Sequence, residues 1–106
     1  MKIIKNNAFE GCKHLQKVNI ASNSEISSIE NSAYASCSIV KLTIPQHVSA
    51  IGPNSFQNCK NLKTIEFIPN SNLKNIEYRT FYESSIESIR IPQHVTVVKE
   101  QAFYHC

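Results

Sequence analysis

The 106-residue sequence contains no aspartate and no tryptophan, and only two glycines. Its eight acidic residues are therefore all glutamates, and they show no paired arrangement of the kind that glycosidases use. No serine or cysteine combines with a recurring histidine partner and a strained glycine turn, as a nucleophilic active site would require. These absences argue against catalysis, and we expect the chain not to be an enzyme.

Strong charge and long apolar runs are missing as well. The formal net charge is only +3, and the eleven lysines and arginines are scattered rather than gathered into a patch, so we expect no nucleic-acid binding. No segment approaches the ~20 apolar residues that cross a bilayer, so we expect no membrane insertion. The start, MKIIKNNAF, lacks the apolar run of roughly 7–15 residues that marks a signal peptide, so we expect none in this chain.

What the sequence does contain is a repeat. The phrase IPQHVSAIGPNSFQNC at Ile44–Cys59 returns 47 positions later as IPQHVTVVKEQAFYHC at Ile91–Cys106. An aromatic residue that follows a small one recurs at steps of 25 and 22 residues, and Cys or Ser follows three positions later. These aromatic residues are Phe9, Tyr34, Phe56, Phe81 and Phe103. A period of about 20–50 residues predicts a solenoid in which stacked units share one core.

Each unit reads L-x-x-I-x-I, a turn, I-x-x-I, a spacer and small-aromatic-x-x-Cys. The first segment alternates apolar and polar residues like a strand, and proline follows it at Pro45 and Pro92, where a strand must end. We expect a second short strand at I-x-x-I and a single helical turn at 6–12 and its copies. The predicted units of this single 1–106 domain are 1–12 (partial), 13–37, 38–59, 60–84 and 85–106. Because the first unit is partial, we expect the chain to be part of a longer array.

The four cysteines and four histidines allow two interpretations. The cysteines could form disulfides or a zinc site, or a ladder of buried thiols in which Ser84 replaces one member. We favour the ladder, because there is no C-x-x-C and free cysteine is usually buried. His47 and His94 occupy one repeat position two turns apart, hence ~10 Å, which is too far for a shared metal. We expect exposed histidines, no metal and no cofactor.

The repeated phrase I-P-x-x-V-x-x-I-x-x-x-[AS]-F-x-x-C, followed by L-x-x-I-x-I, resembles the BspA-type leucine-rich repeat over the whole chain. Departures are Ser84 for Cys, Tyr34 for Phe, and Lys99 where Gly52 stands in the earlier copy. The resemblance implies an α+β, right-handed solenoid of about 4.5 turns, with a parallel sheet on the concave face and short strands or helical turns opposite. It also implies a cell-surface or secreted protein, similar to surface antigens of bacteria and parasitic protists that mediate adhesion, coaggregation and binding to extracellular matrix.

The outward residues of the first strand are the candidate partner-binding residues, because the concave sheet is the usual binding face of a leucine-rich repeat. They form two predicted ladders: Lys17, Lys41, Thr64 and Ser88, and Asn19, Thr43, Glu66 and Arg90. The alternative is an ordinary solvated sheet face. Aromatic anchors, which dominate protein hot spots, are absent from both ladders, and Tyr78, Tyr82 and Tyr104 on the other side could serve instead.

The sequence therefore predicts a non-enzymatic protein-interaction or adhesion module that binds a host or extracellular-matrix protein through its concave face. The alternative is a structural spacer or intracellular scaffold without a dedicated ligand. Since solenoids need polar caps and neither end of this chain supplies one, we also expect end-to-end self-association.

Overall fold

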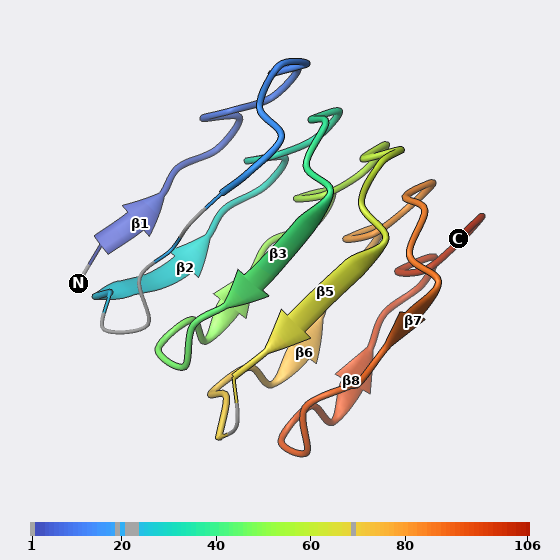
Figure 1. The fold of residues 1–106 in the computed structure, drawn as a ribbon. Coiled ribbons are helices and arrows are strands. Elements are labelled where there is room, and N and C mark those ends of the chain that lie inside the picture. Colours follow the sequence, from blue (N-terminus) through green and yellow to red (C-terminus); the bar gives the residue numbers. More distant parts are fainter. Residues whose placement is uncertain (1, 19, 21–23, 69) are drawn as a thin grey trace.

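The chain winds as a solenoid whose successive turns lie side by side (Figure 1). The structure is a computed structural model that describes residues 2–18, 20, 24–68 and 70–106. Each turn is called a rung here, and rungs 1 to 5 end at Cys12, Cys37, Cys59, Ser84 and Cys106. The strands are β1 (Lys2–Ile4), β2 (Ile26–Ile29), β3 (Lys41–Ile44), β4 (Ala50–Ile51), β5 (Thr64–Phe67), β6 (Asn75–Ile76), β7 (Ser88–Ile89) and β8 (Val97–Val98).

One side of the solenoid is the sheet β3–β5–β7, in which every pairing is parallel. It is built from the L-x-x-I-x-I segments: in β3, Leu42 and Ile44 are buried while Lys41 is exposed, as period-2 alternation demands. In rung 2 the described residues of the same segment make an isolated parallel bridge, between Lys17 and Lys41. The strand prediction for the first segment is therefore confirmed in rungs 3 to 5.

The I-x-x-I segments form the second set of strands, as predicted. The parallel sheet β1–β2–β4 and the pair β6–β8 lie on this side. The last apolar residue of each segment sits at one shared position, and Ile29, Ile51 and Ile76 are all buried there. These strands close the core opposite β3–β5–β7.

The segment from Asn6 to Cys12 and its copies is not the helical turn that we expected. The described residues contain no helix, so the α+β assignment is not confirmed; the segment is a run of hydrogen-bonded turns. The residues two before and two after each aromatic have positive φ, between 54° and 74°. In this segment every second N–H group donates to a carbonyl of the next rung, as Phe9 N does to Ala33 O at 2.7 Å. A helix cannot form because these N–H groups point along the solenoid.

A column of aromatic rings runs through the core. Neighbouring rings stack nearly parallel, with centroids 5.2, 5.5, 5.6 and 5.4 Å apart. The column consists of Phe9, Tyr34, Phe56, Phe81 and Phe103. Burial of a Phe contributes roughly 1.5–3 kcal/mol, and each stacked pair adds roughly 0.5–1.5 kcal/mol. The aromatic spacing in the sequence thus corresponds to one shared ring position per rung.

The expected parallel-strand solenoid is confirmed, with about four turns. Across the described ranges there is no helix with the length and apolar character needed to cross a membrane.

Candidate functional site

The first predicted ladder of outward residues forms a continuous row across the sheet. Lys17 bridges Lys41, Lys41 pairs with Thr64, and Thr64 pairs with Ser88. All four side chains are exposed. The repeat spacing predicted that these residues form one row, and in the structure the register of the paired strands places them side by side.

The second ladder is only partly assembled. Thr43 pairs with Glu66 in the β3–β5 register, whereas Arg90 is exposed directly after β7, beyond the last paired residues Ile65 and Ile89. Asn19 lies outside the described residues. Glu66 Oε1 accepts from Lys41 Nζ at 3.3 Å, which links the two ladders, but both side chains are more than half exposed. Such a pair contributes about 0–1 kcal/mol, so it leaves the face available for other contacts.

An open depression of about 880 Å³ lies at the end of this sheet where β7 stops. Its lining includes four residues of the predicted ladders together with His94 from the following turn. The four are Thr64, Glu66, Ser88 and Arg90. We name the exposed row and this depression together the β3–β5–β7 face. The face is open and of mixed charge, and the depression is also lined by apolar side chains such as Ile65, Phe67 and Ile91. An open surface of this kind suits a macromolecule better than an enclosed small molecule.

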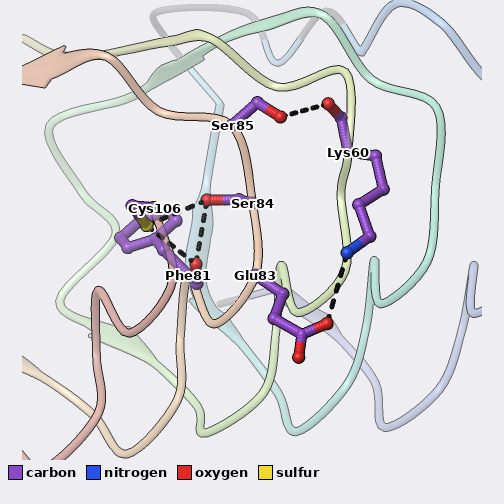
Figure 2. Close-up of polar contacts among 6 residues, drawn as sticks. All are labelled: Lys60, Phe81, Glu83, Ser84, Ser85 and Cys106. Atoms are coloured by element: carbon purple, nitrogen blue, oxygen red, sulfur yellow. Dashed lines mark hydrogen bonds and ion pairs between the residues drawn. The ribbon is translucent and has the colours of Figure 1, made fainter.

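The cysteines form the predicted ladder of thiols, and all four are free. Cys37 Sγ donates to Phe9 O at 2.9 Å, and Cys59 Sγ donates to Tyr34 O at 3.2 Å, so each buried thiol reaches the aromatic carbonyl of the preceding rung. Cys106 does the same toward Phe81 O at 3.2 Å, although it is exposed in the last rung (Figure 2).

Ser84 occupies the cysteine position of rung 4 but bonds differently. Its Oγ donates to Phe81 O within its own rung at 2.8 Å, and lies 3.5 Å from Cys106 Sγ (Figure 2). Nearby, Lys60 Nζ pairs with Glu83 Oε2 at 3.2 Å, which links the first residue of rung 4 to its last turn (Figure 2).

Burial controls the chemistry of this ladder. It raises the pKa of the Cys59 thiol to about 12 and also raises the pKa of Cys37. Burial likewise raises the pKa of the Tyr34 hydroxyl to about 12. Thiols held in the neutral form are poor nucleophiles and poor metal ligands, so these cysteines act as core side chains.

The four histidines are exposed, as predicted. In the part of the chain that the structure describes, no three His, Cys or Glu side chains gather in a way that could hold a metal ion.

A second surface cluster surrounds the tyrosines. Tyr78 and Tyr104 are exposed, as we expected, while Tyr82 is half-buried and stacks on Tyr104 with centroids 5.4 Å apart. The sequence did not single out Arg79, whose guanidinium carbon lies 5.0 Å from the Tyr78 ring centroid and 4.5 Å from that of Tyr82. Arg79 Nε also donates to Gln101 Oε1 at 2.6 Å. In the sequence, the contact between Arg79 and Tyr78 is indicated only by their adjacency. The contact between Arg79 and Tyr82 could not be predicted, because it depends on how the turn folds.

The comparisons with solved structures agree with this architecture. A leucine-rich repeat protein from Bacteroides ovatus is 24% identical, over 97% of this chain and 26% of its own, with a TM-score of 0.87. A leucine rich cell surface protein from Faecalibacterium prausnitzii is 26% identical, over 95% of this chain and 26% of its own, with a TM-score of 0.81. The pneumococcal vaccine antigen PcpA is 22% identical, over 94% of this chain and 25% of its own, with a TM-score of 0.89.

The chain thus spans about a quarter of the length of each of these solved proteins. Comparison with curated protein sequences gave no match. The family model described as BspA type Leucine rich repeat region matches residues 1–106, in six copies. Because that pattern extends over every rung, the chain belongs to the BspA-type leucine-rich repeat family.

Proposed function

We propose that the chain is a non-enzymatic protein-interaction module that binds its partner through the β3–β5–β7 face. The observation that carries the proposal is the unbroken exposed row from Lys17 through Lys41 and Thr64 to Ser88. Membership of a family that includes surface proteins supports a protein partner, since the Faecalibacterium relative is described as a cell surface protein.

The charge of the face defines the chemistry of the partner. Three cations, Lys17, Lys41 and Arg90, stand against the single carboxylate of Glu66 among the candidate residues that the structure describes. Complementary charge accelerates association and selects partners. The proposed partner is therefore a host or extracellular-matrix protein with an acidic surface, met outside the cell that makes this chain.

The test reverses charge on the proposed face and on a matched control. Lys41→Glu with Arg90→Glu should leave the circular dichroism spectrum unchanged, because both side chains are exposed. Binding to an immobilised soluble extract of extracellular matrix should weaken roughly tenfold or more, since two attractions become repulsions. The control, Lys5→Glu with Lys74→Glu, makes the same charge change at exposed positions beside β1 and β6. It should bind like the unaltered chain.

Equal weakening in both double variants would show that net charge rather than this face governs binding. If the unaltered chain failed to bind the extract at all, the structural-spacer interpretation would replace the proposal.

A further inference from the structure

We propose that Arg79, with Tyr78 and Tyr82, forms a second recognition site, which binds the carboxylate of an acidic side chain on a partner protein. The site uses no residue of the β3–β5–β7 face, so it stands independently of the function proposed above. Three features of the turn segment carry the inference: how the guanidinium is held, which charges surround it, and which backbone groups are already engaged.

The contact between Arg79 and Tyr82 is the rung 4 form of a contact that recurs in the turn segments. Side chains at the same two repeat positions, three residues apart, also hydrogen-bond to each other in rungs 1 and 3, as from Asn54 to Gln57. In rung 4 the pair is instead a guanidinium carbon that lies 4.5 Å from a tyrosine ring centroid. The turn brings these two positions together, and the residues there determine what the surface presents.

Three neighbours hold the guanidinium of Arg79. The ring centroids of Tyr78 and Tyr82 lie 5.0 and 4.5 Å from its carbon, and its Nε donates to Gln101 Oε1 at 2.6 Å. The N–H groups on Nη1 and Nη2 make no hydrogen bond among the described residues. They form a fork that matches the two oxygens of a carboxylate. Because the side chain is already ordered, binding costs it little further freedom.

The site lies inside the stack, with a rung on either side. Tyr78 O accepts from Asn54 N of rung 3, and Arg79 N donates to Glu100 O of rung 5. Ser32 and Asn54, which hold the repeat position of Arg79 in rungs 2 and 3, are also partly exposed. This position therefore faces outward from the solenoid in successive rungs.

The charge of Arg79 has no carboxylate partner in the chain. Glu77 and Glu83 of the same turn segment each pair with a lysine, at 3.0 and 3.2 Å. Glu100 of rung 5 is exposed and, like every other carboxylate among the described residues, does not lie within ion-pair distance of Arg79. The guanidinium is thus available to a carboxylate of another molecule. Such charge-assisted hydrogen bonds are roughly twice as strong as neutral ones.

The backbone around the site favours an acidic side chain over a chain terminus. Terminal carboxylates are captured by successive backbone N–H groups that form a nest. The N–H groups of residues 79–83 all donate already, either within the turn or to carbonyls of rung 5. Side-chain donors therefore remain, and beside them the ring of Tyr78 is 40% exposed. An apolar residue next to the acidic one would pack on this ring.

The experiment is an NMR titration of the nitrogen-15-labelled 106-residue chain. The probe is the blocked peptide acetyl-Ala-Leu-Glu-Ala-amide, and its matched control carries Gln in place of Glu. The glutamate peptide should shift the Arg79 Nε–H signal and the amide signals of residues 78–82, with a Kd on the order of 1 mM. The glutamine peptide should bind roughly tenfold or more weakly, since it lacks the charge.

Two variants separate the charge of Arg79 from its fork. Arg79→Gln removes the charge and should weaken binding of the glutamate peptide roughly tenfold or more. Gln101 adopts a φ of 57° at the same repeat position, so glutamine fits this backbone. Arg79→Lys keeps the charge without the fork and should weaken binding roughly threefold or more. The control is Lys74→Gln, which removes an exposed cation from the same rung and should leave binding unchanged.

The amide spectrum of each variant establishes that it is folded before titration. Equal binding of the two blocked peptides, equal loss in Lys74→Gln, or full binding by Arg79→Gln would each overturn the proposal. Shifts confined to Lys41, Thr64 and Arg90 would do the same, because they would assign the peptide to the β3–β5–β7 face. A glutamine peptide with a free C-terminal carboxylate is the last arm. If it bound as tightly as the blocked glutamate peptide, the assignment to an acidic side chain would be wrong.

Discussion

Gly52 lies close to the backbone of the preceding rung, and its replacement by alanine tests the packing between rungs. A Cβ at this position would lie 2.8 Å from Asn31 N and 2.9 Å from the carbonyl carbon of Glu30, which are backbone atoms of the preceding rung. Backbone cannot move aside as a flexible side chain would. The rungs would have to separate locally, and the 2.7 Å hydrogen bond from Gly52 N to Ile29 O would lengthen.

The expected cost follows from these contacts. Overpacking of this kind costs about 1–3 kcal/mol, and the weakened hydrogen bond adds about 0.5–1.5 kcal/mol. Alanine also lowers the conformational entropy of the unfolded chain, which offsets about 0.4–1 kcal/mol of this loss of stability. We therefore expect Gly52→Ala to lower the free energy of unfolding by about 2 kcal/mol, within a range of about 0.5–4 kcal/mol. The central value corresponds to a fall in Tm of roughly 8–16 °C by thermal circular dichroism.

Gly11→Ala provides the matched comparison, because Gly11 adopts a positive φ, whereas Gly52 lies close to a neighbouring backbone. Gly11 has φ of 74°, and no atom lies within 4 Å of the place that an alanine Cβ would take, so strain rather than collision limits a substitution. Ser36, Asn58 and Glu83 hold the same repeat position at φ of 55° to 59°, so the cost should be about 1 kcal/mol or less. A Gly52→Ala variant as stable as Gly11→Ala would refute the close-approach argument.

Three further predictions concern the core. Phe56→Ala should lower the free energy of unfolding by about 3–5 kcal/mol in urea titration, because it opens a cavity in the aromatic column; a loss below about 1 kcal/mol would contradict the stacking. Stability should fall as pH rises from about 9 to about 12, since the unfolded Cys59 thiol loses its proton near 9.0 while the folded one keeps it to about 12; Cys59→Ala should flatten this slope, and an unchanged slope would exclude Cys59 as its source. A maleimide reagent at neutral pH should label Cys106 rapidly and Cys59 only after unfolding, as read by mass spectrometry of peptides, whereas equal labelling would exclude the buried ladder.

The strands and the core could be predicted from the sequence because they depend on repeat spacing. Leu42, Ile65 and Ile89 fall at one position of the L-x-x-I-x-I segment, and the pairing of Thr64 with Lys41 on one side and Ser88 on the other follows from aligning the copies. A one-residue slip would move apolar residues to the surface, so the periodic pattern alone determines the register. The first ladder of the candidate face follows in the same way, whereas the depression beside Arg90 and His94 depends on the turn after β7 and was not predicted.

The turn segments could not be predicted in this way. Positive φ is signalled by Asn7 and Gly11 in rung 1 and by Asn54 in rung 3, which are residue types that favour it. Arg79 and Gln101 adopt the same conformation without any such preference, because the hydrogen bonds to the next rung require it. The tight approach at Gly52 also depends on the separation of two rungs, which no single copy of the repeat reveals.

The hydrogen bonds of the turn segments have an electrostatic consequence. The peptide group between Asn31 and Ser32 accepts from Asn7 N and donates to Pro53 O, and this relay continues through every rung in three parallel columns. Aligned peptide dipoles add as they do along an α-helix, and chains of hydrogen bonds polarise one another. The column is thus positive at the N–H groups of residues 101–105 and negative at the carbonyls of residues 6–10. Its positive pole lies at the C-terminal end, opposite to that of a helix, and each added rung lengthens the dipole.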